Sequence, residues 1–217
     1  MHAMTDDVKR PYRSRRRAES AEQTRELIHD AAARLFVARG VSATTMRQVA
    51  AEAGVAERTV YNAFPTKTTL FNEVVNIAIV GDDLPVPVAD RTSFTDLVTE
   101  TDPRRAATLY VTFGVALFER AGDHIMAAIE SAGADADMRE FCDRSAAANR
   151  ANMLTLAQAW SDNGLLRPHL DAESAADLLH TLGSPHVYHL LCRLRDWSAD
   201  RYCEWLIETL LTTVLRS

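Results

Sequence analysis

Long apolar runs are missing from this sequence of 217 residues. No stretch approaches the roughly 18 apolar residues of a membrane-spanning helix, and the N-terminus is charged and polar, unlike an apolar secretory leader. These absences predict a protein without a membrane partner. Cysteine is also scarce, since Cys142, Cys192 and Cys203 are an odd set without C-x-x-C spacing. Neither a disulfide framework nor a structural zinc site is therefore expected, and a reducing cytoplasm fits.

Glycine and proline, which interrupt helices, number only eight and seven. Sustained alternation of Val, Ile and Thr, the pattern of strands, is missing too. Ala, Leu, Arg and Glu are abundant, while apolar residues make up 47% and charged residues 25% of the chain. This composition is close to that of an average soluble globular protein, and it favours an all-α fold.

Charge is spread unevenly along the chain, although the net charge of −6 is acidic. Residues 1–70 hold 12 Lys and Arg against 8 Asp and Glu, a balance of +4. Residues 71–217 hold 12 against 22, a balance of −10. A basic end joined to an acidic body is expected when only that end meets a polyanion such as nucleic acid.

The N-terminal third is predicted to contain a basic arm and short helices. Residues 1–19 carry an Arg-rich run without apolar periodicity, so we predict a disordered arm that can follow DNA phosphates or enter a minor groove. Residues 20–39 carry an apolar stripe and end at Gly40, which predicts a helix. Further helices are expected at about 45–53, capped by Thr44 or Thr45, and at 56–63, followed by one that starts near residue 66. The apolar stripe of the first helix consists of Leu27, Ile28, Ala31, Ala32, Leu35 and Phe36.

Two short helices joined by a turn at Gly54, behind a longer apolar helix, form a helix-turn-helix pattern. The second short helix, residues 56–63, has Val60 as its single inward apolar residue. A helix that reads the major groove must present such a polar outer surface. Its other side chains are Ala56, Glu57, Arg58, Thr59, Tyr61 and Asn62.

Residues 24–70 resemble the DNA-binding region of the tetracycline-repressor-like (TetR) family. The resemblance rests on Gly40, on the runs 44–50 (TTMRQVA), 53–55 (AGV) and 59–67 (TVYNAFPTK), and on Leu70. It implies an all-α protein of about nine to ten helices, with an N-terminal three-helix helix-turn-helix DNA-binding domain and a larger helical ligand-binding and dimerisation domain. It also implies a homodimeric regulator, usually a repressor, that binds double-stranded operator DNA and needs no cofactor.

The resemblance also implies roles for individual residues. Phosphate contacts are expected from Thr45, at a positive helix end, and from Thr59, Tyr61 and Lys67. Arg47 is expected to reach a guanine edge in the groove. The expected base readers are Glu57, Arg58 and Asn62.

Other interpretations of these residues stay open at this point. Tyr61 with Lys67 can be an ordinary exposed pair, Arg47 a solvated charge, and Glu57 with Asn62 bystanders facing the groove. The chain departs from the family at three positions. Val41 stands where the family often has an aromatic residue, Arg58 where it often has a glycine, and Ala63 where it often has histidine or tyrosine. These departures put the operator sequence in doubt.

The segment 81–90 (GDDLPVPVAD) is the clearest linker. We therefore predict three parts: the arm 1–19, a DNA-binding domain 20–81, and a ligand-binding and dimerisation domain 82–217. Helices are expected in the last part at about 93–100, 104–121, 123–132, 136–163, 172–195 and 199–215, with Pro185 kinking the fifth.

By the same resemblance, the last two long helices, 172–195 and 199–215, are expected to form the dimer. Some of their apolar stripe must instead be domain core; the stripe is Leu190, Leu191, Leu194, Trp197, Tyr202, Trp205, Leu206 and Leu210. A pocket for a small, largely apolar effector is expected among the middle helices, although any single candidate can be plain core. The candidate liners are Phe113, Leu117, Met126, Phe141, Met153, Trp160 and His180.

Other functions find less support in the residues. A metal site at His180, His186, His189 and Cys192 lacks an acidic ligand, and no activating cluster accompanies the cysteines. The sequence contains no G-x-S-x-G, H-E-x-x-H, P-loop or G-x-G-x-x-G motif. An all-helical enzyme remains an alternative, but it leaves the basic arm, Tyr61 and Lys67 unexplained. A helical protein-interaction module is the other alternative, and it predicts a partner protein and no steeply salt-dependent affinity for DNA.

Overall fold

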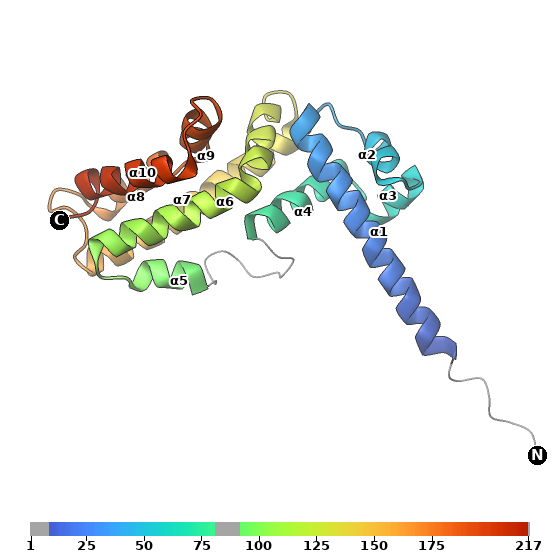
Figure 1. Cartoon of the computed structure of the whole chain (residues 1–217), viewed down its shortest axis with the longest axis horizontal. Coiled ribbons are helices and arrows are strands. Elements are labelled where there is room, and N and C mark those ends of the chain that lie inside the picture. The colour runs from blue at the N-terminus through green and yellow to red at the C-terminus, as the bar shows by residue number, and fades with distance from the viewer. Residues whose placement is uncertain (1–8, 81–91, 217) are drawn as a thin grey trace, which may run out of the picture. The chain divides into compact units, whose positions relative to one another are not determined.

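The computed structural model describes residues 9–80 and 92–216 (Figure 1). The predicted linker 81–90 and the first eight residues of the predicted arm lie outside these ranges. The chain divides into two compact units between Val74 and Val75, inside one helix. No helix among the described residues is both long enough and apolar enough to cross a membrane.

The predicted all-α fold is confirmed, since the described residues form helices and one isolated bridge between Leu166 and Leu215. The first unit holds α1 (Lys9–Arg39), α2 (Met46–Ala53), α3 (Glu57–Ala63) and the start of α4 (Lys67–Val80). The second unit holds the end of α4 and the remaining helices. These are α5 (Thr92–Thr99), α6 (Pro103–Ser131), α7 (Ala136–Asp162), α8 (Ala172–Leu182), α9 (Pro185–Tyr188), the π-helical turn η2 (His189–Arg193) and α10 (Ala199–Thr213).

Helix α1 begins at Lys9 rather than at residue 20, so residues 9–19 are helical and not the disordered segment predicted. Elongating an existing helix adds a hydrogen bond for each residue ordered, and the Arg, Ala and Glu residues of this segment are good helix formers. Pro11 falls in the first turn, where its missing N–H costs no intrahelical bond. Most of the predicted stripe of α1 packs inward, but Leu27 is 54% exposed. Phe36 meets Phe71 of α4 edge to face at 5.4 Å.

Helix α6 is a single element where the sequence predicted two, because Gly122 does not interrupt it. One interior glycine costs about 1 kcal/mol relative to alanine, and burial of its neighbours Phe118 and Ala121 offsets this cost. The break predicted at Gly133 does occur, since α6 ends at Ser131.

The predicted helix 172–195 is divided into α8, α9 and η2. Pro185 cannot continue a helix from the preceding turn, but its ring suits the first position of a new one. Ser184 caps that new helix, with its hydroxyl accepting from the Val187 amide at 3.3 Å. The expected kink is therefore a full break.

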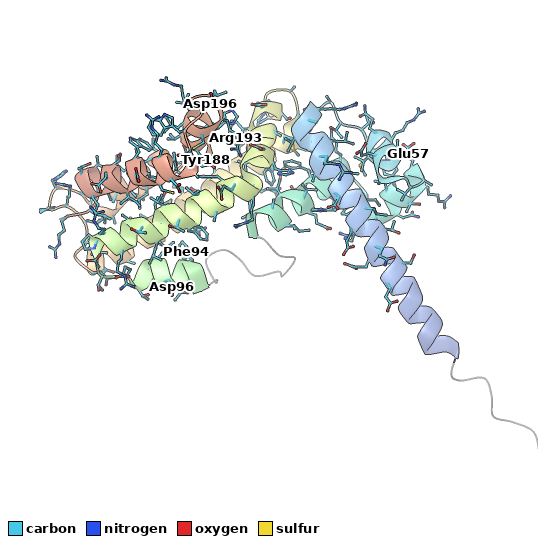
Figure 2. The ribbon with its side chains drawn as sticks, viewed as in Figure 1. Glu57, Phe94, Asp96, Tyr188, Arg193 and Asp196 are labelled. Atoms are coloured by element: carbon cyan, nitrogen blue, oxygen red, sulfur yellow. The ribbon has the colours of Figure 1, made fainter. Side chains whose placement is uncertain are left out.

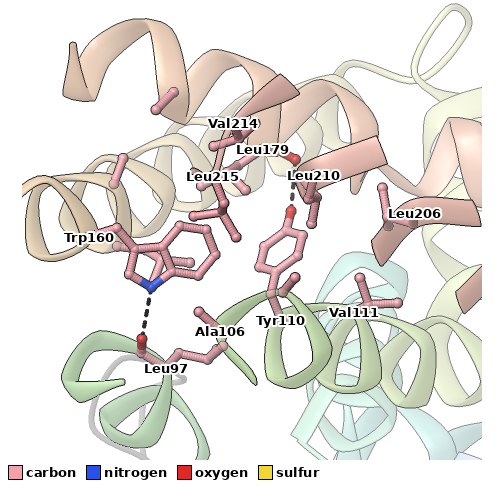
Figure 3. Packing of buried hydrophobic residues seen from close by; sticks show 14 of the residues in the cluster. Leu97, Ala106, Tyr110, Val111, Trp160, Leu179, Leu206, Leu210, Val214 and Leu215 are labelled. Atoms are coloured by element: carbon pink, nitrogen blue, oxygen red, sulfur yellow. Dashed lines mark hydrogen bonds between the residues drawn. The ribbon is translucent and has the colours of Figure 1, made fainter. Parts of the chain in front are cut away.

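The core of the second unit lies between α6, α7, α8 and α10 (Figure 3). Two buried polar atoms are satisfied there by distant carbonyls. Trp160 donates its indole N–H to the Leu97 carbonyl at 3.0 Å. Tyr110 donates its hydroxyl to the Leu179 carbonyl at 2.7 Å, which ties α6 to the last turn of α8.

Candidate functional site

Helix α2 has a defined cap at each end, and the C-terminal cap forms the turn to α3. Thr45 is the N-cap, and it forms a reciprocal capping box with Gln48. Thr44 is instead buried, and its hydroxyl donates to the Gly40 carbonyl at 2.8 Å. Gly54 ends the helix at φ +68°, a conformation that favours glycine. The two short helices thus have a well-defined connection.

Helix α3 presents nearly its whole surface outward. Val60 is its only buried residue, and the buried Phe64 anchors the chain just after it. Glu57 (labelled on α3 in Figure 2), Arg58 and Asn62 are exposed. A structural helix of this length would normally bury more apolar surface, so α3 is built to show polar groups.

The structure leaves most of the predicted DNA-contacting side chains accessible. Thr45 and Arg47 are exposed, Tyr61 is 47% exposed, and Thr59 is half-buried. Lys67 is also half-buried, and its ammonium donates to the Val41 carbonyl at 2.8 Å. That bond holds the connection between α1 and α2 against the start of α4.

Sequence reasoning missed Arg25, which joins three helices of the first unit. From α1, its guanidinium pairs with both oxygens of Glu73 on α4, with Nε at 2.9 Å from Oε1. It also donates to the Ala63 carbonyl at the end of α3, at 3.1 Å, and lies 4.2 Å from the centre of the Phe64 ring. Its position one turn before the buried Ile28 is the only sign of this role in the sequence.

A family model described as "Bacterial regulatory proteins, tetR family" matches residues 28–74, from α1 into α4. The N-terminal region of the chain, residues 28–74, is therefore similar to the TetR family. It is 39% identical over 61 residues to the HTH-type transcriptional regulator AcrR of Shigella flexneri, covering 28% of each chain. It is 44% identical over 62 residues to the HTH-type transcriptional regulator SrpR of Pseudomonas putida, covering 29% of each. These matches span less than a third of either relative.

A solved structure resembles the chain over nearly its whole length. NalD of Pseudomonas aeruginosa, described as the secondary repressor of the MexAB-OprM multidrug efflux pump, superposes with a TM-score of 0.70 at 25% identity. That match covers 92% of this chain and 99% of NalD.

The second unit of the chain contains an apolar cavity of about 580 Å³. Five of the seven predicted liners border it: Phe113, Leu117, Phe141, Met153 and His180. Two do not. Trp160 is fully buried in the core, where Leu97 provides the acceptor that its N–H requires. Met126 lies on the same helix as Ile125 and Ile129, and those two residues line the cavity instead.

One wall of the cavity carries polar groups that the sequence did not reveal. The Oδ1 atom of Asn149 of α7 accepts a hydrogen bond from Nδ1 of His180 of α8 at 2.7 Å. Asp143 and Asn152 of α7 also line the cavity, and so does Ser184. No Lys, Arg or Glu is among the described residues that border it.

The histidines and cysteine that the sequence analysis considered, and did not favour, as metal ligands lie on α8, α9 and η2. No group of three or more His, Cys, Asp or Glu among the described residues is suited to hold a metal ion. The pKa of both Cys192 and Cys203 is raised, with burial as the largest cause. A raised pKa keeps a thiol protonated and less reactive.

The structure divides the apolar stripe that the sequence left undivided. Tyr202, Leu206 and Leu210 of α10 are buried in the core. Leu190 is 51% exposed and Leu194 is 64% exposed. Between them in the sequence lies Arg193 (labelled in Figure 2). It pairs with Asp123 of α6 at 3.2 Å.

Proposed function

We propose that this chain is a ligand-responsive, sequence-specific DNA-binding transcriptional regulator that acts as a repressor. The observation that carries the proposal is α3, a short helix with one buried residue and a polar outer surface. NalD, which resembles 92% of the chain, is described as a repressor.

In this proposal α3 lies in the major groove of operator DNA. Glu57, Arg58 and Asn62 read base edges, and Arg47 from α2 reaches a guanine edge. Phosphates are held by Thr45, Thr59, Tyr61 and Lys67. The DNA-binding domain comprises residues 20–81, preceded by the basic segment 1–19.

We further propose that two copies associate through the C-terminal helices of the domain formed by residues 82–217. Phosphate contacts give no sequence specificity, and one short helix reads few bases, so a dimer on a palindrome doubles the sequence that is read. Leu190 and Leu194 are exposed, and Trp205 on α10 is only partly buried, so these side chains offer apolar surface for a partner copy.

A small, largely apolar molecule in the cavity is the proposed effector. Val75 and Ile79 of α4 line the cavity, while the start of the same helix belongs to the DNA-binding unit. A ligand that binds more tightly to the form unable to span two successive major grooves shifts the population off DNA. A ten-fold loss of operator affinity needs only about 1.4 kcal/mol of coupling. All three cysteines are free, which suits a cytoplasmic regulator.

Selection of bound sequences from random DNA tests the function. We expect a palindrome, and affinity for it that falls steeply with salt. Arg58→Ala should weaken binding by about 1–3 kcal/mol and relax the preference at one base of each half-site. Arg144→Ala on α7, an exposed arginine of the second unit, is the matched control and should bind normally. Enrichment of no sequence, or equal losses in both variants, would contradict the proposal.

A second measurement tests the dimer. Sedimentation should detect a dimer at micromolar concentration, and Leu194→Glu should shift it toward monomer because a charge would be buried at the apolar contact. Leu27→Glu, at an equally exposed leucine of α1, is the control. A chain that sediments only as a monomer would refute the palindrome mechanism.

A further inference from the structure

The polar wall of the cavity constrains the chemistry of the effector. We infer that the cavity takes an amphipathic molecule whose polar end is a hydrogen-bond donor without negative charge, received by His180. This inference rests on the proposed function for the role of the cavity, and it adds the ligand class and the residue that selects it.

The first step is the orientation of the His180 ring. Its Nδ1 lies 2.7 Å from Oδ1 of Asn149. An amide oxygen only accepts, so Nδ1 carries the proton, and in the neutral imidazole the other nitrogen, Nε2, is then an acceptor. No hydrogen bond from Nε2 to a described residue is found. His180 therefore offers a lone pair in a cavity whose other walls are mainly apolar.

The second step is the field at this wall. His180 is in the last turn of α8, and Gly183, which follows that helix, lines the cavity. A helix C-terminus carries about half a negative charge. Two tyrosine hydroxyls already donate to carbonyls there, Tyr110 to Leu179 and Tyr202 to Leu182 at 3.4 Å. The end of α8 therefore attracts donors.

The third step is the balance of formal charge. Asp143 is the only Asp, Glu, Lys or Arg among the described residues that line the cavity, and its side chain is exposed. An anion entering the cavity would meet that carboxylate and the end of α8 without any Lys or Arg to compensate its lost hydration. A neutral hydroxyl has no charge to desolvate, and an ammonium group, which also loses hydration, meets the Asp143 carboxylate as an opposite charge.

Matched probes test this inference on the full-length chain by isothermal titration calorimetry. The probes para-tert-butylphenol, para-tert-butylanisole and para-tert-butylbenzoate share one apolar body. The phenol presents a hydrogen-bond donor, the anisole presents only an acceptor, and the benzoate presents an anion. At about pH 8 we expect the phenol to bind at least about ten-fold more tightly than either of the others. Equal binding of phenol and anisole, tighter binding of benzoate, or no binding of the phenol at about 1 mM would overturn the inference.

Two variants connect the selectivity to this pair of residues. His180→Leu should reduce the preference for phenol over anisole to less than about three-fold while leaving anisole affinity in place. Asn149→Leu changes an exposed residue, so it preserves folding, and it should weaken the same preference by releasing the ring. His169→Leu is the control, because His169 is exposed and outside the cavity. Retention of full selectivity in both test variants would also overturn the inference.

Operator binding, measured separately without any probe, distinguishes the two proposals. Specific DNA binding without phenol selectivity would refute the proposed ligand class alone. Phenol selectivity without specific DNA binding would refute the proposed regulatory function and support the proposed ligand class.

Discussion

Replacing Arg25 with glutamine should destabilise the first unit far more than the same change at Arg34. Both arginines lie on α1 and pair with a glutamate of another helix. Arg25 is 39% exposed and its partner Glu73 29%, whereas Arg34 and Glu52 are 62% and 46% exposed. Arg25 also donates to the Ala63 carbonyl and stacks on Phe64, while Arg34 makes one pairing at 3.2 Å.

These contacts determine how much stability the Arg25→Gln variant is expected to lose. The half-buried, two-oxygen pair stands at the upper end of the range for accessible ion pairs, about 1 kcal/mol. The bond to Ala63 and the aromatic contact together add a similar amount. We expect Arg25→Gln to cost about 2 kcal/mol, roughly a 30-fold change in the unfolding equilibrium. Arg34→Gln should cost less than about 0.5 kcal/mol, because exposed pairs contribute little.

Urea unfolding followed by circular dichroism measures both variants. The double variant with Glu73→Gln should cost less than the two single changes added together, because the pair is lost once. Arg25→Gln should also weaken operator binding, since the end of α3 loses an anchor. Equal destabilisation by the two arginine variants, or full additivity in the double variant, would refute the reasoning.

Three further predictions concern single residues. Tyr61→Phe should leave stability unchanged, since the side chain is 47% exposed. It should weaken operator binding without changing the salt dependence of that binding, because a neutral hydroxyl that bonds a phosphate displaces no counterion; unchanged affinity would remove Tyr61 from the interface. Gly183→Ala should cost more than about 2 kcal/mol in urea unfolding, because the added Cβ would collide with the Tyr110 hydroxyl, whereas Gly114→Ala, where a Cβ has open space, should be tolerated. Burial raises the pKa of Tyr110 and Tyr202 above the ordinary value of 10.0. Their neutral forms therefore stabilise the fold below about pH 10, and that stability is lost as the pH rises further. Tyr110→Phe should flatten the decline of the melting temperature above pH 10, and an unchanged slope would contradict this.

The parts of the structure that could be predicted from the sequence depend on neighbouring residues. Helical periodicity, the cap at Thr45 and the left-handed turn at Gly54 involve contacts within a few positions, so a local pattern specifies them. The outward surface of α3 follows from the single apolar position at Val60. Helix ends were less predictable, because Gly122 stays helical only where its neighbours are buried, and Pro185 starts a helix only where Ser184 caps it.

The sequence by itself determined that the chain is helical and carries a polar reading helix near one end, because period and capping are properties of adjacent residues. Only the tertiary structure decided which apolar residues are core and which face solvent or a cavity. Tyr202 and Leu194 belong to one apolar stripe in the sequence, yet the first is buried and the second exposed. Asn149 and His180 meet across two helices. Such outcomes depend on how helices distant in the chain pack, and no local pattern encodes that packing.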